Sequence, residues 1–406
     1  MLASLPPASQ DRLEAYFAAI GDILRHKKKR ASFAMYALGL LGSSERKSFE
    51  PIAMQFCTEP DEADAMHQRV QHFVTDAEWS DRDVRRAAAR YAIAAMIERS
   101  PVRAWIIDDT GFIKQGSHSV GVQRQYTGTA GKITNCQVGV SLVVANDEMH
   151  VPIDFDLYLP ESWANDPKRR AEAKIPDEVR FRTKLEIAMD LIQRAALERL
   201  PGDIVLADAA YGESSEFRAY LRLLGFDYAV GVQSNLHVTM LDAAERRRGD
   251  SLRVRDAAAS LGPGRFRKVT WRDGTKAALS SRFAFARVKV PREGLDAAKV
   301  DAEWLVVEWP EDEDQPTKFF LTTLGRRLSK KQIVRMIKER YRTARAYQEL
   351  KGELGLDHFE GRRYRGWQHH ISVALACYAF VIGERVRAFP PGAEGPSDDD
   401  EIDDAA

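Results

Sequence analysis

The 406-residue sequence predicts an α/β fold that begins with helices and is interrupted by a mostly β insertion. Three observations predict it. Residues 1–100 are rich in Ala, Leu, Arg and Glu at helical spacing, with few helix breakers. From Val102 onward, short apolar runs typical of strands alternate with helical segments. Twice, an apolar run ends in a carboxylate that is followed shortly by a glycine, at Asp108 and at Asp208.

Residues 1–100 are expected to form a helical domain with one basic side. Residues 11–25 predict one helix, with its apolar side chains on a single face. A basic run follows that helix directly, comprising Lys27, Lys28, Lys29 and Arg30 after His26. Such a run is as often a solvated face as a phosphate contact, and the sequence favours neither.

The segment WIIDDTGF, Trp105 to Phe112, introduces the strands. A brief run of bulky apolar residues closed by Asp and Gly predicts a short buried strand that ends at Asp108 and turns at Gly111. Aspartate often satisfies backbone donors in turns, so on this segment alone Asp108 fits a turn residue as well as a catalytic one.

The following segments predict the order of a known core. Residues 133–147 and 149–160 form a hairpin around an Asn-Asp-Glu turn, and a Pro- and charge-rich loop at 161–177 leads to a helix at 182–197. DIVLADAAYG, residues 203–212, then repeats the strand, carboxylate and glycine pattern before a helix at 213–224. Three strands, helix, strand, helix is the order of a ribonuclease-H-like core. In that layout the ends of the first and fourth strands are neighbours, which places Asp108 and Asp208 within reach of each other.

The predicted domains follow from these segments. The first part of the core is expected at residues 101–227, a β-rich insertion at 228–325 and the C-terminal helices of the core at 326–390. One long helix is expected from the capping box at Ser329 to Gly352 or beyond, and a final buried helix at 371–382.

The charge of the chain is asymmetric. The net charge is zero, with 60 basic and 60 acidic residues, but residues 391–406 carry seven acids and no base. Without those seven acids the body has a net charge of +7. The tail is expected to be disordered, and a solvating end is favoured over a mimic of nucleic-acid charge.

The expected compartment is the cytoplasm. The N-terminus lacks the pattern of a secretory signal, and no apolar run approaches the roughly eighteen residues of a membrane span. The three cysteines are far apart and have no metal-ligand spacing, which indicates small buried residues in a reducing compartment.

Two carboxylates at the ends of neighbouring strands suggest a divalent metal, because like charges at close range otherwise cost stability. Mg²⁺ prefers oxygen ligands and is typically held by one or two carboxylates with substrate phosphate. Two such ions, about 3.5 to 4 Å apart, can activate a nucleophile and stabilise the departing oxygen of a phosphodiester.

Long motifs extend this interpretation. Residues 106–140 (IIDDTGF to NCQVGV), 205–212 (VLADAAYG) and 351–370 (KGELGLDHFEGRRYRGWQHH) together resemble the DDE transposases of bacterial insertion sequences, most closely insertion sequence family 701. The resemblance covers nearly the whole body and excludes the acidic tail. It implies Asp108 and Asp208 as the first two catalytic acids, a two-metal Mg²⁺ site with Mn²⁺ as a substitute, and double-stranded transposon-end DNA as substrate. It also implies a homodimer on DNA and association with the bacterial nucleoid.

The third acid departs from the family pattern. Related transposases carry Arg, three residues, Glu, six residues and Lys on a helix; Arg340 and Lys351 fit, but Ala344 stands at the glutamate position. On a continuous helix, position 344 shares with Lys351 the face expected to look into the core. Glu339 and Glu349 lie about 140° away around the helix and Glu353 about 180° away, so none replaces it. The chain is therefore expected to bind DNA and to be severely impaired in cleavage. Since the other motifs are intact, an engineered Glu→Ala change explains this more economically than decay.

Further basic residues are candidates for phosphate contacts. Arg340 and Lys351 are expected near the scissile phosphate, while Lys114, His118, Arg124 and Lys132 flank the first strands. Two alternatives to an active transposase remain: a DNA-binding protein derived from a transposase, which Ala344 supports, and a nuclease that hydrolyses without joining.

Overall fold

The structure is a computed structural model that describes residues 6–272, 279–291 and 300–388. The predicted acidic tail lies outside the described residues. The chain divides into two compact units, each described separately below. The first comprises Met1–Arg103, Asp108–Pro201 and Arg342–Ala393; the second contains Ala104–Ile107 and Gly202–Tyr341.

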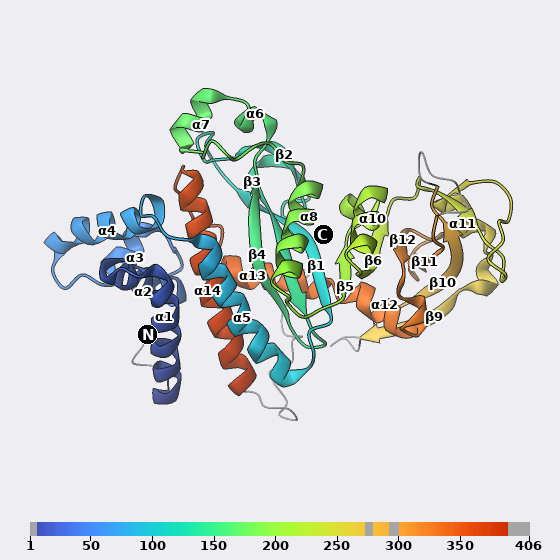
Figure 1. Cartoon of the computed structure of the whole chain (residues 1–406), viewed down its shortest axis with the longest axis horizontal. Helices are drawn as coiled ribbons and strands as arrows, with labels where there is room; N and C mark the ends of the chain where they lie inside the picture. The colour runs from blue at the N-terminus through green and yellow to red at the C-terminus, as the bar shows by residue number, and fades with distance from the viewer. Residues whose placement is uncertain (1–5, 273–278, 292–299, 389–406) are drawn as a thin grey trace. The chain divides into compact units, whose positions relative to one another are not determined.

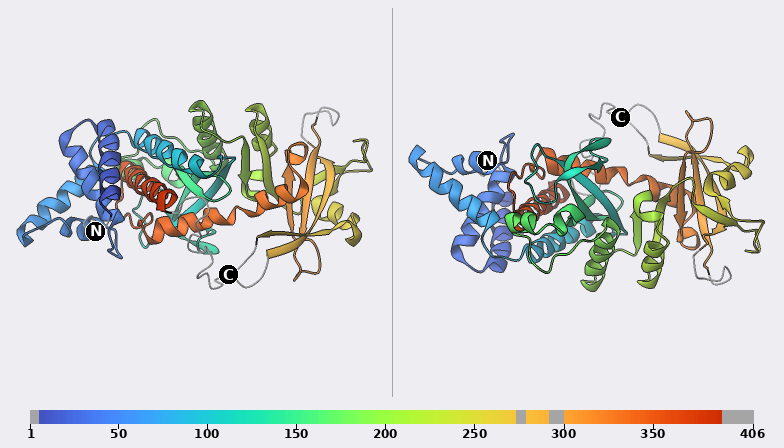
Figure 2. Two further views of the ribbon diagram at one scale, coloured as in Figure 1. Left: turned by 90° about the horizontal axis from the view of Figure 1, so that it is seen from below. Right: turned by 90° about the horizontal axis from the view of Figure 1, so that it is seen from above.

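The N-terminal part of the first unit is helical, as predicted. Its helices are α1 (Pro7–Leu24), α2 (Lys27–Leu41), α3 (Phe49–Met54), α4 (Ala63–Thr75) and α5 (Asp81–Arg99). They pack around the last helix, α14 (Tyr364–Ala388), which Figures 1 and 2 show beside α5. Most of the side chains of α14 are buried, as expected for a helix that is apolar on all sides. The helix predicted at residues 371–382 is thus correct and begins earlier.

The sheet of the first unit contains β2 (Gln123–Thr127), β3 (Lys132–Ala145) and β4 (His150–Tyr158), all antiparallel. The predicted hairpin is present: the Asn146 side chain accepts hydrogen bonds from the backbone N–H groups of Glu148, at 3.0 Å, and Met149, at 2.7 Å. Helix α8 (Lys184–Leu197) begins with the capping box of Thr183 and lies against β3 and β4.

The segment predicted as a loop after β4 is partly helical. It forms the short helices α6 (Glu161–Ala164) and α7 (Pro167–Ala173). The loop prediction was wrong here because Pro also starts helices: Asp166 caps α7, and Pro167 occupies its first turn.

Strand β1 (Ala104–Ile113) is longer than predicted, and its extent corrects the expected turn at Gly111. Asp108 lies in the middle of this ten-residue strand. Gly111 marks a close approach, since a Cβ atom there would lie 2.1 Å from the hydroxyl oxygen of Thr127. The chain needs glycine at this point to pass Thr127 and continues extended.

The second unit contains the remaining strands of the core. The first four residues of β1 pair in parallel with β5 (Ile204–Ala207), and β5 pairs in parallel with β6 (Asp227–Val232). β5 is followed by α9 (Ala209–Gly212) and α10 (Ser215–Leu223). β6 therefore belongs to the core sheet, although residues from 228 onward were expected in the insertion.

The rest of the second unit is mostly β, as predicted. Neighbouring strands in the sheet follow the order β6, β12, β11, β10, β7 and β8, with β9 beside β10 (Figure 1). Their bounds are β7 His237–Met240, β8 Leu252–Arg253, β9 Arg267–Arg272, β10 Leu279–Lys289, β11 Glu303–Trp309 and β12 Lys318–Thr322, with the helix α11 at Val254–Ser260.

The single long helix predicted from Ser329 is two helices, α12 (Lys330–Lys338) and α13 (Tyr341–Gly352). The capping box at Ser329 is present. Tertiary contacts hold each helix separately: Lys338 of α12 pairs with Glu308 of β11 at 2.8 Å, whereas Thr343 of α13 bonds to His150 of β4 at 3.1 Å. Residues 339–340 have ordinary helix propensity, and neither is a helix breaker. The break between the two helices therefore comes from these separate tertiary contacts.

Acid should destabilise the fold through three buried histidines. Burial lowers the pKa of His150 to about 3 and those of His369 and His370 to about 4, below the ordinary value of about 6.5. Their stabilising contribution is complete above pH 6.5 and is lost as the pH falls toward 4. Urea unfolding should show a loss of about 1 kcal/mol per histidine between pH 7.5 and 5.5. A flat free energy of unfolding over this range would contradict the assignment.

Candidate active site and nucleic-acid interface

The two aspartates singled out by the sequence follow paired strand residues. In the parallel register of β1 and β5, Ile107 is the partner of Ala207. The next residue in each strand segment is an aspartate, Asp108 after Ile107 and Asp208 after Ala207. The four paired residues of each strand are buried, so the register is tightly specified.

Asp208 lies where β5 ends. Its side chain accepts a hydrogen bond of 2.9 Å from the Ala210 backbone N–H and caps α9. The helix then passes close to β6, because a Cβ atom on Gly212 would lie 2.1 Å from the carbonyl oxygen of Gly231. The small residues of VLADAAYG thus set the sharp turn that leaves Asp208 half-buried at the strand end.

Asp108 and Asp109 serve different faces of β1. Asp109 forms an ion pair of 2.9 Å with Lys184 of α8. Phe112, which shares the face of Asp108 by strand alternation, packs edge-on against Trp367 of α14. Asp108 therefore belongs to the face that α14 covers, and Asp109 points toward α8.

Helix α13 is attached to β1 near Asp108 by two side chains one turn apart. The Tyr347 hydroxyl hydrogen-bonds to the Ser141 hydroxyl, which lies 3.4 Å from the carbonyl oxygen of Asp108. The Lys351 ammonium donates to the carbonyl oxygen of Gly111 at 2.8 Å and to the Thr129 hydroxyl at 3.2 Å. Burial lowers the pKa of Lys351.

Ala344 lies one turn before Tyr347 and is exposed. The expectation that its face looks into the core was wrong, because α13 buries Thr343, Ala346, Tyr347 and Leu350 instead. Position 344 lies at the edge of this buried stripe, on the solvent side.

The alternative glutamates of α13 are directed elsewhere. Glu349 accepts from the Tyr378 hydroxyl at 3.0 Å and pairs with Arg385 at 2.8 Å, both on α14. Glu353 is exposed beyond the end of the helix. Neither glutamate side chain lies on the helix face that carries Ala344.

The predicted basic run follows α1 directly, as expected, and it also forms the first turn of α2. Lys27, Lys28 and Arg30 are exposed, and Arg30 lies 3.1 Å from Asp22. Lys29 is half-buried and donates to the carbonyl oxygen of Glu78. Positive charges at a helix N-terminus interact unfavourably with the helix dipole, so these cations destabilise α2 taken by itself.

Of the other side chains predicted to contact DNA, some are exposed and one is already hydrogen-bonded within the protein. Arg124 and Lys132 are exposed, as is His118, and Arg340 is half-buried in the second unit. Lys114 instead donates to the carbonyl oxygens of Asp357, at 3.1 Å, and Phe359, at 2.7 Å, and burial lowers its pKa.

A basic pocket of about 700 Å³ opens beside the start of α2. Its lining includes His26, Lys28, Lys29, Arg69 and His72. Arg69 and His72 were not predicted as ligand contacts; their spacing of three residues, which places both on one face of α4, was the available signal.

The acids that line the same pocket already have cationic partners. Asp76 pairs with Arg363 and lies 3.6 Å from Lys174, and Glu78 lies 3.6 Å from Arg365. Within the described residues, Lys28 and Arg69 form no ion pair with an acid, although Arg69 donates to the Ser32 hydroxyl at 3.2 Å. These two cations can therefore pair with an anionic ligand.

No group of three or more histidine, cysteine or acidic side chains placed to hold a metal occurs in the described part of the chain. Asp108 and Asp208 supply carboxylate oxygens, the ligand type that Mg²⁺ prefers. Within the same ranges, no helix is both long and apolar enough to cross a membrane.

The strand order β2-β3-β1 continues through β1 into β5 and β6, with β4 paired to β3. This is a mixed α/β sheet of the ribonuclease-H-like type. A model of the DDE superfamily endonucleases matches residues 19–278. The chain therefore belongs to the DDE superfamily of endonucleases.

One relative is the probable transposase for insertion sequence element IS701 from Microchaete diplosiphon. It is 34% identical to this chain over 175 residues, which span 43% of each protein. The resemblance to insertion-sequence transposases expected from the motifs is thus confirmed.

The Lys351 contacts predict a measurable stabilisation. Lys351→Met keeps most of the aliphatic stem but removes both hydrogen bonds, so it should lower the free energy of unfolding by about 2 kcal/mol. The exposed Lys132→Met should change it by less than about 0.5 kcal/mol. Equal effects of the two substitutions in urea unfolding would contradict the structural role of Lys351.

Proposed function

We propose that the chain is a DNA transposase that binds transposon ends and is built for metal-dependent strand cleavage and strand transfer. The observation that carries the proposal is the β1–β5 register, in which paired residues are each followed by an aspartate. Membership of the DDE superfamily, which generally uses divalent metal ions, supports a metal role for these carboxylates.

The side chains present supply only part of the oxygen ligands that a two-metal magnesium site would need. Asp108 and Asp208 would hold one Mg²⁺, or Mn²⁺ as a substitute, because one or two carboxylates with substrate phosphate suffice for such an ion. When bound, the metal supplies charge stabilisation at the phosphate and a more acidic attacking water or hydroxyl. A two-metal site needs further oxygen ligands, and Ala344 offers none. We therefore infer that this form cleaves DNA poorly.

The protein's own groups would position the reacting strand. Asp208 is oriented by its bond to the Ala210 N–H, and Tyr347 and Lys351 fix α13 against β1. An exposed glutamate at position 344 would then project from a fixed helix. Such preorganisation is what an in-line attack on phosphate requires.

Double-stranded DNA is the proposed partner, both as transposon inverted repeats and as target. The basic pocket and the exposed Lys27, Arg124 and Lys132 would contact phosphates, with Arg340 nearer the scissile bond. We further propose a homodimer on DNA, a nucleoid-associated cytoplasmic location and the five-part domain division given above, with the first part of the core extended through β6.

A second function is favoured by Ala344 itself. The same surface would serve a DNA-binding protein derived from a transposase, in which chemistry has been lost. Such a protein would bind the same ends and gain nothing from a restored carboxylate.

Restoring the carboxylate separates the two functions. Ala344→Glu should produce Mg²⁺-dependent cleavage of duplexes that carry the inverted repeats flanking the gene, at least about 100-fold above the unsubstituted chain, as expected for recovery of electrostatic stabilisation in the transition state. Ala344→Gln is the matched control, since it has nearly the same size without the charge. No gain with glutamate would favour the DNA-binding protein.

Phosphate contacts in the basic pocket should appear in the salt dependence of DNA affinity. Removing one contact lowers the slope of log K against log salt by about one, so Lys28→Ala and Arg69→Ala should each do this. Arg246→Ala, an exposed arginine paired with Asp242 elsewhere in the chain, is the control. An unchanged slope in both pocket variants would remove the basic pocket from the DNA interface.

A further inference from the structure

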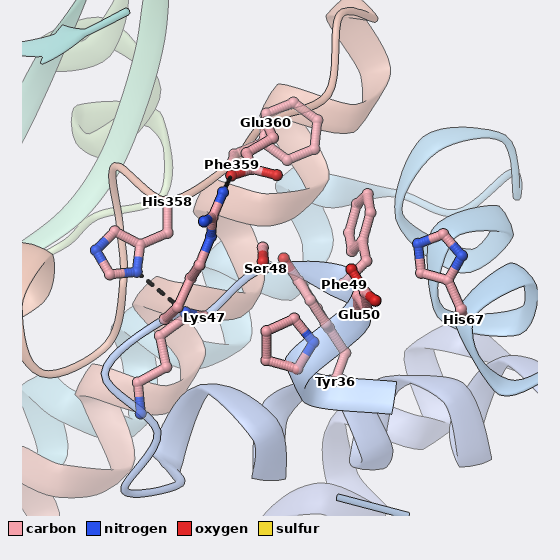
Figure 3. Close-up of a pocket in the computed structure, with 11 residues that line it drawn as sticks. Tyr36, Lys47, Ser48, Phe49, Glu50, His67, His358, Phe359 and Glu360 are labelled. Atoms are coloured by element: carbon pink, nitrogen blue, oxygen red, sulfur yellow. Dashed lines mark hydrogen bonds and ion pairs between the residues drawn. The ribbon is translucent and has the colours of Figure 1, made fainter. Parts of the chain in front are cut away.

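A second pocket in the first unit has aromatic walls and belongs to none of the sites above. It encloses about 270 Å³, slightly less than most small-molecule sites, which have about 300–1,000 Å³. Figure 3 shows its lining from α2, the start of α3, α4 and residues 358–360. We call it the aromatic pocket, defined by Tyr36, Phe49 and Phe359.

The aromatic rings of the pocket form a fixed wall. Phe49 meets Phe359 edge-on, with ring centroids 6.1 Å apart, and lies 5.9 Å from Tyr36. Phe359 is buried and stacks on His370 at 5.4 Å, while the Tyr36 hydroxyl donates to His370 Nδ1 at 2.7 Å. Only Phe49 is half-buried and presents part of its ring to a ligand.

Three polar side chains that line the aromatic pocket have no hydrogen bond within the described residues: Ser48, His67 and the exposed carboxylate of Glu50. The Ser48 hydroxyl does not cap α3, and the His67 ring lies beside Phe49, with ring centroids 6.4 Å apart. By contrast, His358 Nδ1 accepts from the Lys47 backbone N–H at 3.1 Å. Ser48 and His67 can therefore donate to or accept from a ligand without breaking an internal bond.

The rim of the pocket carries a cation that a phosphate could recruit. Arg46, which lines the pocket, pairs with Glu360, and their side chains are 68% and 57% exposed. Exposed pairs of this kind contribute little to stability, so the guanidinium can turn to another anion at small cost.

We propose that the aromatic pocket holds one unpaired nucleobase of bound DNA, with the adjacent phosphate at Arg46. A base has a planar face for Phe49 and a polar edge for Ser48 and His67, and stacking on aromatic side chains is how proteins commonly hold unpaired bases. The inference deepens the proposed function and rests on it, since it requires that the chain binds DNA.

The test compares two short fluorescein-labelled duplexes of the same sequence, one fully paired and one with a single extra unpaired adenine. Fluorescence anisotropy is measured with the full chain in EDTA, so that no strand is cut. The unpaired adenine should tighten binding about tenfold, the fold-change expected from one stacked base.

Two variants and two controls locate the effect. Phe49→Ala and His67→Ala should each reduce the preference to less than about threefold, with unchanged affinity for the paired duplex. Phe181→Ala, a half-buried ring outside the pocket, and His237→Ala, an exposed histidine, should keep the preference. Retained affinity for the paired duplex shows that a variant is folded, and His67→Ala tests the site even if Phe49→Ala unfolds.

The outcomes are distinct. Equal binding of both duplexes by the unsubstituted chain would overturn the nucleobase site and leave the DNA-binding function standing. Binding of neither duplex would overturn both. A preference that survives Phe49→Ala and His67→Ala would assign the unpaired base to another surface and contradict the proposal.

Discussion

The parallel pairing of β1 with β5 is the constraint on which the account of this protein depends. Four buried residues of each strand fix the register, and both strands lead directly into an aspartate. In a buried sheet a slip of one residue would turn every side chain to the opposite face, so the core holds the register firmly. Because Gly212 and Gly231 let α9 pass close to β6, the turn after β5 keeps Asp208 at the strand end. A pairing that stabilises the fold thus also orders the candidate catalytic groups.

Helix α13 carries Ala344, the position at which the proposed function expects a third acid. Its contacts with β1, β3 and β4 through Lys351, Tyr347 and Thr343 do not involve Ala344. An exposed alanine on a well-anchored helix costs little, so alanine at position 344 is compatible with an intact fold. Under the proposed function, the surfaces that would contact phosphate do not depend on this position, whereas the ligand set for a second metal ion would.

Much of the fold was predictable because its signals are local. The hairpin follows from Asn146, the capped helices from Thr183 and Ser329, and the core from the order of its segments. The errors arose where distant contacts decide the structure. Gly111 resembles a turn residue until Thr127 is placed beside it, and residues 339–340 continue a helical pattern until separate anchors divide it. The aromatic pocket was missed for the same reason: Phe49, His67 and Phe359 are distant in sequence and share no motif.

We propose that Asp108 and Asp208 bind one metal ion together. Mn²⁺ titration followed by electron paramagnetic resonance, with the chain bound to duplex DNA carrying the flanking repeats, tests it most directly. Asp108→Asn and Asp208→Asn should each abolish the same tight Mn²⁺ site, because a single carboxylate retains the ion poorly. Asp109→Asn, next in the chain but paired with Lys184, should leave it intact. Tight Mn²⁺ binding that persists in either Asp108→Asn or Asp208→Asn would contradict the shared site.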